Sequence, residues 1–280
     1  MSRPIEDYAI IGNAYTAALV SRDGSIDWLC LPRFDSESVF AALLGEPKHG
    51  RWLLAPQDPD ARCSRTYRGE TGILETRFET AEGVATIIDF MPFTGREDQI
   101  DLIRLVRGDK GRVRMHTDIV LRFNYGRGIP WVRAHLGGPS AVAGPNAVQF
   151  VTPVPLHGTK DLTTRGEFTV RAGETVPFTM SWYPSHHRGY HYRDPLDHLL
   201  ETENAWCDWS NRCTLKGPWR EAIVRSLITL KMLTYQPTGG IVAAATTSLP
   251  EALGGVRNWD YRFCWIRDAT LTLYALLSSG

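Results

Sequence analysis

Apolar and polar residues alternate from the start of the chain to about residue 183, and this two-residue period is what most limits the fold. The longest example lies in residues 112–123, where Val113, Met115 and Ile119 fall on one face and Arg114 and His116 on the other. Successive side chains of a strand point to opposite faces of a sheet, whereas an amphipathic helix repeats every three to four residues. The period therefore predicts long, half-buried strands.

Turn residues separate further strand candidates at short intervals. Residues 74–79 alternate and reach a second apolar run at 84–90 through Ala81, Glu82 and Gly83, which predicts a hairpin. The other strand candidates are residues 17–20, 25–29, 102–106, 148–151, 167–170 and 178–182. Short strands joined by turns are typical of packed antiparallel sheets, so residues 1–183 are expected to form a large antiparallel β-sandwich domain.

The pattern changes after about residue 183. Residues 184–217 hold helix-compatible segments and are predicted to be a linker with a helix. Pro218 stands where a helix can begin, and apolar residues then recur at three- and four-residue steps until Pro237. Another helix is expected over residues 269–277, with Asp268 as a candidate N-cap. Two helices do not bury a domain core, so residues 218–280 are expected to begin an incomplete, truncated helical domain.

Charge and cysteine content exclude several classes of partner. Lys plus Arg number 31 and Asp plus Glu number 31, so no net charge attracts nucleic acid or an anionic membrane. No apolar run approaches the roughly 20 residues of a membrane span, and the acidic N-terminus does not fit a secretion signal. Five scattered cysteines indicate reduced thiols. We expect a cytoplasmic protein with no cofactor, metal, nucleic-acid or membrane partner, and leave homo-oligomerisation open.

Residues 258–268 form the motif most informative about function, because four aromatic residues are interleaved there with two arginines and two aspartates. The apolar face of a pyranose packs on a flat aromatic ring, and its hydroxyl groups bind carboxylates and guanidinium groups through charge-assisted hydrogen bonds. The adjacent Arg267 and Asp268 are therefore candidates to hold neighbouring hydroxyls of one sugar. A buried ion pair that fixes a loop explains the same residue types, and composition alone leaves both interpretations open.

A second cluster of aromatic and charged residues follows the turn at Gly24. Trp28, Arg33 and Asp35 in this cluster are candidates for secondary contacts to a sugar from a loop of the sandwich. The alternative, which is favoured, is that Trp28 packs in the sandwich core while Arg33 pairs with Asp35 at a domain interface.

Two segments resemble a known family. Residues 258–269 resemble the motif that opens the catalytic domain of glycoside hydrolase family 15, which includes glucoamylases, glucodextranases and bacterial trehalases. Residues 10–13, 18–20 and 24–36 resemble the trehalase-like N-terminal domain of the same family. The resemblance implies an antiparallel β-supersandwich followed by the first helices of an α/α toroid, a barrel of six helical hairpins. It also implies an inverting attack on an α-linked terminal glucose.

The same resemblance implies roles for individual residues. Arg267 and Asp268 would hold hydroxyls of the terminal glucose, Trp265 would line its pocket, and Trp259 and Tyr261 would also bind substrate. The general acid and base of the family are glutamates far downstream of this motif, so no residue up to Gly280 is assigned a catalytic role. The expected function is that of the N-terminal part of an inverting glycoside hydrolase, inactive on its own. Trehalose is favoured as substrate over short α-glucans or maltooligosaccharides, and the alternative is a non-catalytic carbohydrate-binding or scaffolding β-sandwich module.

Overall fold

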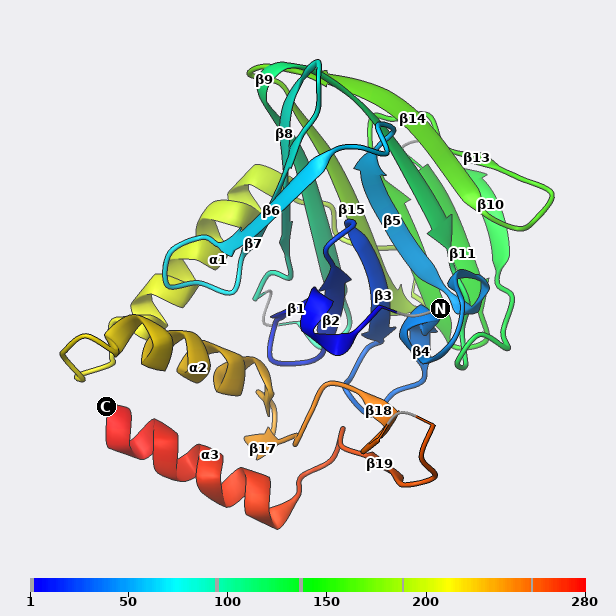
Figure 1. The fold of residues 1–280 in the computed structure, drawn as a ribbon. Coiled ribbons are helices and arrows are strands. Elements are labelled where there is room, and N and C mark those ends of the chain that lie inside the picture. Colours follow the sequence, from blue (N-terminus) through cyan, green and yellow to red (C-terminus); the bar gives the residue numbers. More distant parts are fainter. Residues whose placement is uncertain (1–2, 94–95, 136–137, 188, 253) are drawn as a thin grey trace.

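The computed structural model describes residues 3–93, 96–135, 138–187, 189–252 and 254–280, and its architecture is mainly β (Figure 1). Fifteen strands are linked in one antiparallel network, which folds into two layers because the long strand β9 (Ile100–Val120) belongs to both. The first part of β9 pairs with strands of one layer, and its last part pairs with strands of the other. The predicted mainly β, antiparallel architecture is confirmed.

Each layer surrounds one half of β9. The first layer contains β1 (Tyr8–Gly12), β2 (Ala17–Ser21), β3 (Ser25–Cys30), β4 (Ser38–Phe40), β5 (Arg51–Pro56), β13 (His157–Gly158) and β14 (Thr164–Arg171). The second contains β6 (Arg62–Tyr67), β7 (Leu74–Glu79), β8 (Gly83–Phe90), β10 (Trp131–His135), β11 (Gly138–Ala143), β12 (Asn146–Val151) and β15 (Thr175–Pro184). Short 3₁₀ helices cover Ile5–Asp7, Ala42–Leu44 and Pro47–His49.

The strand candidates at 102–106 and 112–123 are parts of one continuous strand of 21 residues that ends at Val120. The intervening Gly108, Asp109, Lys110 and Gly111 have the composition of a turn, but they stay paired with β8 through a register shift. Gly111 has a φ of +62°, and a Cβ there would lie 2.3 Å from the carbonyl oxygen of Glu82. The glycine therefore lets the strand carry on past an irregular stretch of its pairing with β8.

The hydrophobic core lies between the two layers. Ile11 and Met115 enter it from the first layer, and Ile87, Val106 and Phe178 enter it from the second. Along β9 every second side chain from Val113 to Ile119 is buried, as the alternation predicts. Burial of apolar surface on this scale is the main contribution that holds the sandwich together.

A buried ion pair also joins the layers. Arg104 and Asp89, both with fully buried side chains, pair at 2.7 Å within the second layer. The same guanidinium donates hydrogen bonds to the carbonyl oxygens of Trp52 (2.9 Å) and Gly24 (2.7 Å) in the first layer. The guanidinium thus bonds both its counter-ion and the backbone of the opposite sheet.

Within the described residues, three α-helices follow the sandwich: α1 (Pro195–Ser210), α2 (Arg220–Met232) and α3 (Ile266–Ser279). The helix predicted in the linker is confirmed as α1, whose N-cap Asp194 accepts a hydrogen bond from the Leu196 amide at 2.8 Å. The amphipathic helix predicted after Pro218 is confirmed as α2. Asp268 as N-cap of the last helix is wrong, because α3 already begins at Ile266 and places Asp268 in its first turn.

The helices lie at one side of the sandwich, and α2 lies between α1 and α3 (Figure 1). Between α2 and α3 the chain forms two small hairpins, β16 (Thr234–Tyr235) with β17 (Gly240–Ile241) and β18 (Thr247–Pro250) with β19 (Asn258–Asp260). None of the helices within the described residues is long and apolar enough to cross a membrane.

Candidate functional site

Residues 258–265, here called the motif loop, run from β19 to the start of α3. β19 pairs with β18, which fixes the first part of the loop. The amides of Ala243 and Ala244 then donate to the carbonyl oxygens of Phe263 (3.1 Å) and Tyr261 (2.9 Å). The backbone of the motif loop is therefore held along its length by the small-residue segment that precedes β18.

An ion pair inside the motif loop fixes its conformation. The guanidinium of Arg262 donates to both carboxylate oxygens of Asp260, at 2.9 and 2.7 Å, and the Arg262 amide donates to the same side chain at 3.0 Å. Burial alone would raise the pKa of Asp260, but the hydrogen bonds from Arg262 outweigh it and lower that pKa. Asp260 is therefore ionised at neutral pH and organises the loop, as a loop-forming acceptor would.

Arg262 also connects the motif loop to the N-terminal segment. Its Nη1 donates to the carbonyl oxygens of Ser36 (2.7 Å) and Phe34 (3.3 Å), and the guanidinium lies 5.6 Å from the ring centroid of Tyr125. Only 5% of Arg262 is exposed. The two segments that carry the family resemblance, more than 220 residues apart, thus meet at this side chain. No role was predicted for Arg262, although an arginine two residues after an aspartate was a signal for a pair of this kind.

The aromatic side chains of the motif loop form an open surface. Trp259, Phe263 and Trp265 are 47%, 50% and 37% exposed. The rings of Tyr261 and Trp265 lie 5.3 Å apart at 43°, and the Trp265 indole N–H donates to the carbonyl oxygen of Asp260 at 3.1 Å. The Trp259 indole N–H donates to Glu251 Oε1 at 3.1 Å. The hydrogen bonds satisfy the indole N–H groups, and the exposed parts of the rings offer apolar surface of the kind on which sugar rings pack.

Arg267 and Asp268 lie on the first turn of α3, two and three residues after Trp265. The two side chains pair at 3.1 Å, and 71% of the Arg267 side chain is exposed against 27% for Asp268. An exposed pair of this kind contributes little to stability, so its donors and acceptors stay available to a ligand. The buried, loop-fixing pair considered from the sequence exists as well, but Asp260 and Arg262 form it.

The cluster after Gly24 splits into a packing part and an exposed part. Trp28 is completely buried, and its indole N–H donates to the carbonyl oxygen of Ala245 at 2.7 Å. With no exposed surface Trp28 offers nothing to a sugar, so a secondary substrate contact by this residue does not fit the structure. Arg33 pairs with Asp35 at 2.9 Å and covers the ring of Tyr235 at 5.0 Å. These positions match the packing alternative.

Not all the candidates come together. Within the residues that the structure describes, no hydrogen bond or ion pair joins the Arg33–Asp35 pair to the Arg267–Asp268 pair. The same part of the chain has no group of three or more His, Cys, Asp or Glu side chains arranged to hold a metal ion. The motif loop and the first turn of α3 therefore remain as the candidate site: partly exposed aromatic side chains, followed in the chain by an exposed guanidinium and a partly exposed carboxylate.

Comparison with known proteins places the chain among its relatives. Residues 1–134 match the family model described as trehalase-like, N-terminal, and residues 217–280 match that of glycosyl hydrolases family 15. Trehalases of Mycobacterium tuberculosis and Thermoplasma volcanium are each 34% identical to this chain over 99% of its length, which covers 44% and 45% of the respective relatives. The chain thus spans a little under half the length of these curated relatives.

A solved structure supports the fold. The crystal structure of a bacterial glucoamylase complexed with acarbose aligns with all of this chain and with 48% of its own, at a TM-score of 0.70 and 11% identity. At that identity the likeness concerns the fold alone. Because both family models match in order along the chain and trehalases match nearly all of it, the chain belongs to the trehalase- and glucoamylase-like glycoside hydrolases of family 15.

Proposed function

We propose that the protein to which this chain belongs hydrolyses α-linked glucose with inversion, that trehalose is its preferred substrate, and that this chain is its N-terminal part. The relatives named trehalase support the substrate. The observation that carries the proposal is the solvent-accessible pair of Arg267 and Asp268, which begins two residues after the partly exposed Trp265 in the chain. A guanidinium and a carboxylate beside an open aromatic face are the groups that a pyranose needs.

In this proposal the motif loop binds the terminal glucose. Trp265, Tyr261 and Trp259 contact the apolar faces of the sugar, while Arg267 donates to its hydroxyl oxygens and Asp268 accepts from its hydroxyl groups. Inversion needs one carboxyl to protonate the leaving oxygen and a second, roughly 6.5–9.5 Å away, to activate water. We assign both to glutamates beyond Gly280, so the chain alone is proposed to be inactive.

We further propose that residues 1–183 form the sandwich domain, 184–217 a linker and 218–280 the start of an α/α toroid. The exposure of α3 supports the last point. Its buried residues are Thr272 and Ser279, whereas Leu271, Tyr274 and Leu277 are 63%, 73% and 82% exposed. Apolar helix faces of this kind pack against neighbouring elements, and further helices of a toroid would supply them. A cytoplasmic location is proposed on the five free cysteines.

The proposal is tested by glucose release from trehalose and maltose, with the released anomer followed by polarimetry, for the protein at its natural length and for residues 1–280. Initial release of β-glucose by the longer protein, faster from trehalose, is the expected result. Inversion at one anomeric carbon of trehalose gives β-glucose and leaves the other glucose as the α anomer, so release of α-glucose alone from trehalose would contradict inversion. Sugar binding without any release would favour the non-catalytic binding module instead.

Substitutions at the pair test its role directly. Loss of charge-assisted hydrogen bonds to substrate predicts that R267M lowers kcat/KM by about 10- to 150-fold. The matched control is R257M, because Arg257 is an exposed arginine just before the motif loop. Equal kcat/KM values for R267M, R257M and the wild type would remove Arg267 from the site.

A further inference from the structure

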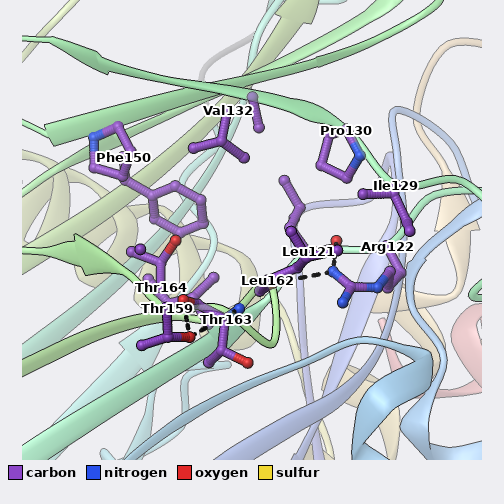
Figure 2. Close-up of a pocket in the computed structure, with 14 residues that line it drawn as sticks. Leu121, Arg122, Ile129, Pro130, Val132, Phe150, Thr159, Leu162, Thr163 and Thr164 are labelled. Atoms are coloured by element: carbon purple, nitrogen blue, oxygen red, sulfur yellow. Dashed lines mark hydrogen bonds between the residues drawn. The ribbon is translucent and has the colours of Figure 1, made fainter.

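A cavity lies in the sandwich, among β10, β11, β13 and the end of β9 (Figure 2). These strands lie away from α3 in Figure 1, and none of the residues that line the cavity belongs to the motif loop. Its volume is about 230 Å³. Most of its wall is apolar and includes Leu121, Pro130, Val132 and Phe150. Ile129, Val132 and Leu162 in this wall are more than half exposed and mark the opening.

One cation lies in this apolar wall. Arg122 is only 8% exposed, and its Nη1 donates to the carbonyl oxygens of Leu121 (2.8 Å) and Leu162 (3.3 Å), as Figure 2 shows. Across the described part of the chain, Arg122 forms no ion pair with a carboxylate, and its Nε and Nη2 have no hydrogen-bond partner. Neither nitrogen is among the buried polar atoms that are sealed from solvent. Part of the guanidinium therefore stays both unpaired and accessible.

A largely buried charge without a counter-ion is unfavourable, because water solvates only part of it. Burial lowers the pKa of Arg122, and the charge of Asp161 opposes this effect. Asp161 itself is exposed, pairs with Arg165 at 3.2 Å and accepts from the hydroxyl of Thr163. The carboxylate whose charge acts on Arg122 is therefore already engaged elsewhere, and within the described residues the guanidinium has no ion pair of its own.

Residues 159–163 form a turn at the cavity, and the carbonyl oxygen of Leu162 in this turn accepts a hydrogen bond from Arg122. The amide of Thr159 donates to the carbonyl oxygen of Thr163 at 2.8 Å, and the amide of Leu162 donates to the carbonyl oxygen of Thr159 at 3.1 Å. These bonds hold Leu162 at a φ of +60°, a region that residues with a Cβ rarely adopt. In this conformation its carbonyl oxygen bonds Arg122 and its side chain stays at the opening of the cavity.

We propose that this cavity binds a small monocarboxylate with an apolar body of the size of one ring, and that the carboxylate pairs with the free nitrogens of Arg122. A dry cavity of about 150 Å³ holds benzene, so the larger volume here suits a ring that carries a carboxylate. The charge-assisted hydrogen bonds between guanidinium and carboxylate supply the missing counter-ion. A hydroxyl-rich sugar would lose its hydrogen bonds to water against the leucine, proline, valine and phenylalanine side chains.

Benzoate is the probe, measured by titration calorimetry and by saturation-transfer NMR on the protein at its natural length. Benzoate is expected to bind, and benzyl alcohol, which has the ring without the charge, at least about tenfold more weakly. R122M should weaken benzoate by a similar factor. R133M is the matched control, because Arg133 is exposed and its side chain leaves β10 on the face opposite to Val132.

A second variant keeps the test valid if R122M does not fold. Ala141 lines the cavity and is 3% exposed, so A141L fills the space while leaving the Arg122 residue unchanged and should abolish benzoate binding. Benzoate and benzyl alcohol of equal affinity, or unchanged benzoate affinity in R122M or A141L, would overturn the proposal. Because the readout is binding and not glucose release, its outcome is independent of the hydrolase proposal.

Discussion

Replacement of Arg262 by methionine should release the motif loop from the sandwich. Methionine keeps much of the apolar volume but removes the donors to Ser36 and Phe34. Each of the two lost hydrogen bonds costs about 1 kcal/mol. Asp260 loses its partner as well, but about a third of its side chain is exposed, so water solvates the carboxylate and the added loss is about 1 kcal/mol. The expected decrease in the free energy of unfolding is therefore about 3 kcal/mol.

The assay is urea unfolding of the protein at its natural length, followed by the fluorescence of the tryptophans, two of which lie in the motif loop. R262K keeps the charge but not the planar fork, so we expect a loss between those of R262M and the wild type. R257M changes the same charge at an exposed site and should cost less than about 0.5 kcal/mol. A loss below about 1 kcal/mol for R262M would refute the anchoring role.

R262M should also affect the proposed activity, although Arg262 is not placed against the substrate. A loosened loop no longer holds Trp265, Arg267 and Asp268 in one arrangement, so kcat/KM on trehalose should fall even where the protein is fully folded. An unchanged kcat/KM in the folded variant would separate the loop from the substrate site.

Three further outcomes follow from the sandwich and the loop. R104M should cost about 3–5 kcal/mol because it leaves the carboxylate of Asp89 buried and unpaired, whereas the D89L/R104M double variant should recover most of that loss in urea unfolding. G24A should lower the melting temperature clearly, since Gly24 has a φ of +83° and a Cβ there would lie 2.2 Å from the carbonyl oxygen of Leu54. The pKa of Asp260 is lower in the folded than in the unfolded state, so its contribution is present above the unfolded value of about 3.9 and is lost as pH falls through the folded value. The difference in unfolding free energy between the wild type and D260N should therefore shrink in acid, and a difference that grows below about pH 4 would contradict this sign.

The strands were predictable because alternation is a local property of the sequence. Residues 74–79 and 84–90 form the hairpin that their pattern indicates. The continuity of β9 was not predictable from the same pattern. Gly108 and Gly111 around two charged residues have the composition of a turn, and pairing with β8 together with hydrogen bonds to residues 172–174 keeps them within the strand. The prediction of Asp268 as N-cap was wrong for a related reason. The backbone at Trp265, and not the side chain of Asp268, sets where α3 begins.

The residue types of the candidate site were predictable, but the sequence did not indicate which arginine is buried and fixes the loop and which stays exposed. Arg262 and Arg267 both lie in the motif and both pair with a neighbouring aspartate, at 2.7 and 3.1 Å. Their difference is burial: 5% of the Arg262 side chain is exposed against 71% for Arg267. That burial comes from residues 30–36 and Tyr125, which contact Arg262 from far away in the sequence. Local composition does not contain this information.

The contacts of the sandwich with the motif loop bear on the choice between an enzyme and a separate binding module. An independent sandwich would satisfy its own buried donors and acceptors. Here the indole of Trp28 donates to the carbonyl oxygen of Ala245, and the carbonyl oxygens of Phe34 and Ser36 accept from Arg262. The sandwich and residues 245–262 therefore each satisfy polar groups of the other. A sandwich separated from residues 240–265 would leave a buried tryptophan N–H without its partner, at a cost of about 1–3 kcal/mol. The N-terminal layers are therefore part of the support of the candidate site, which favours the proposed hydrolase over a module that works alone.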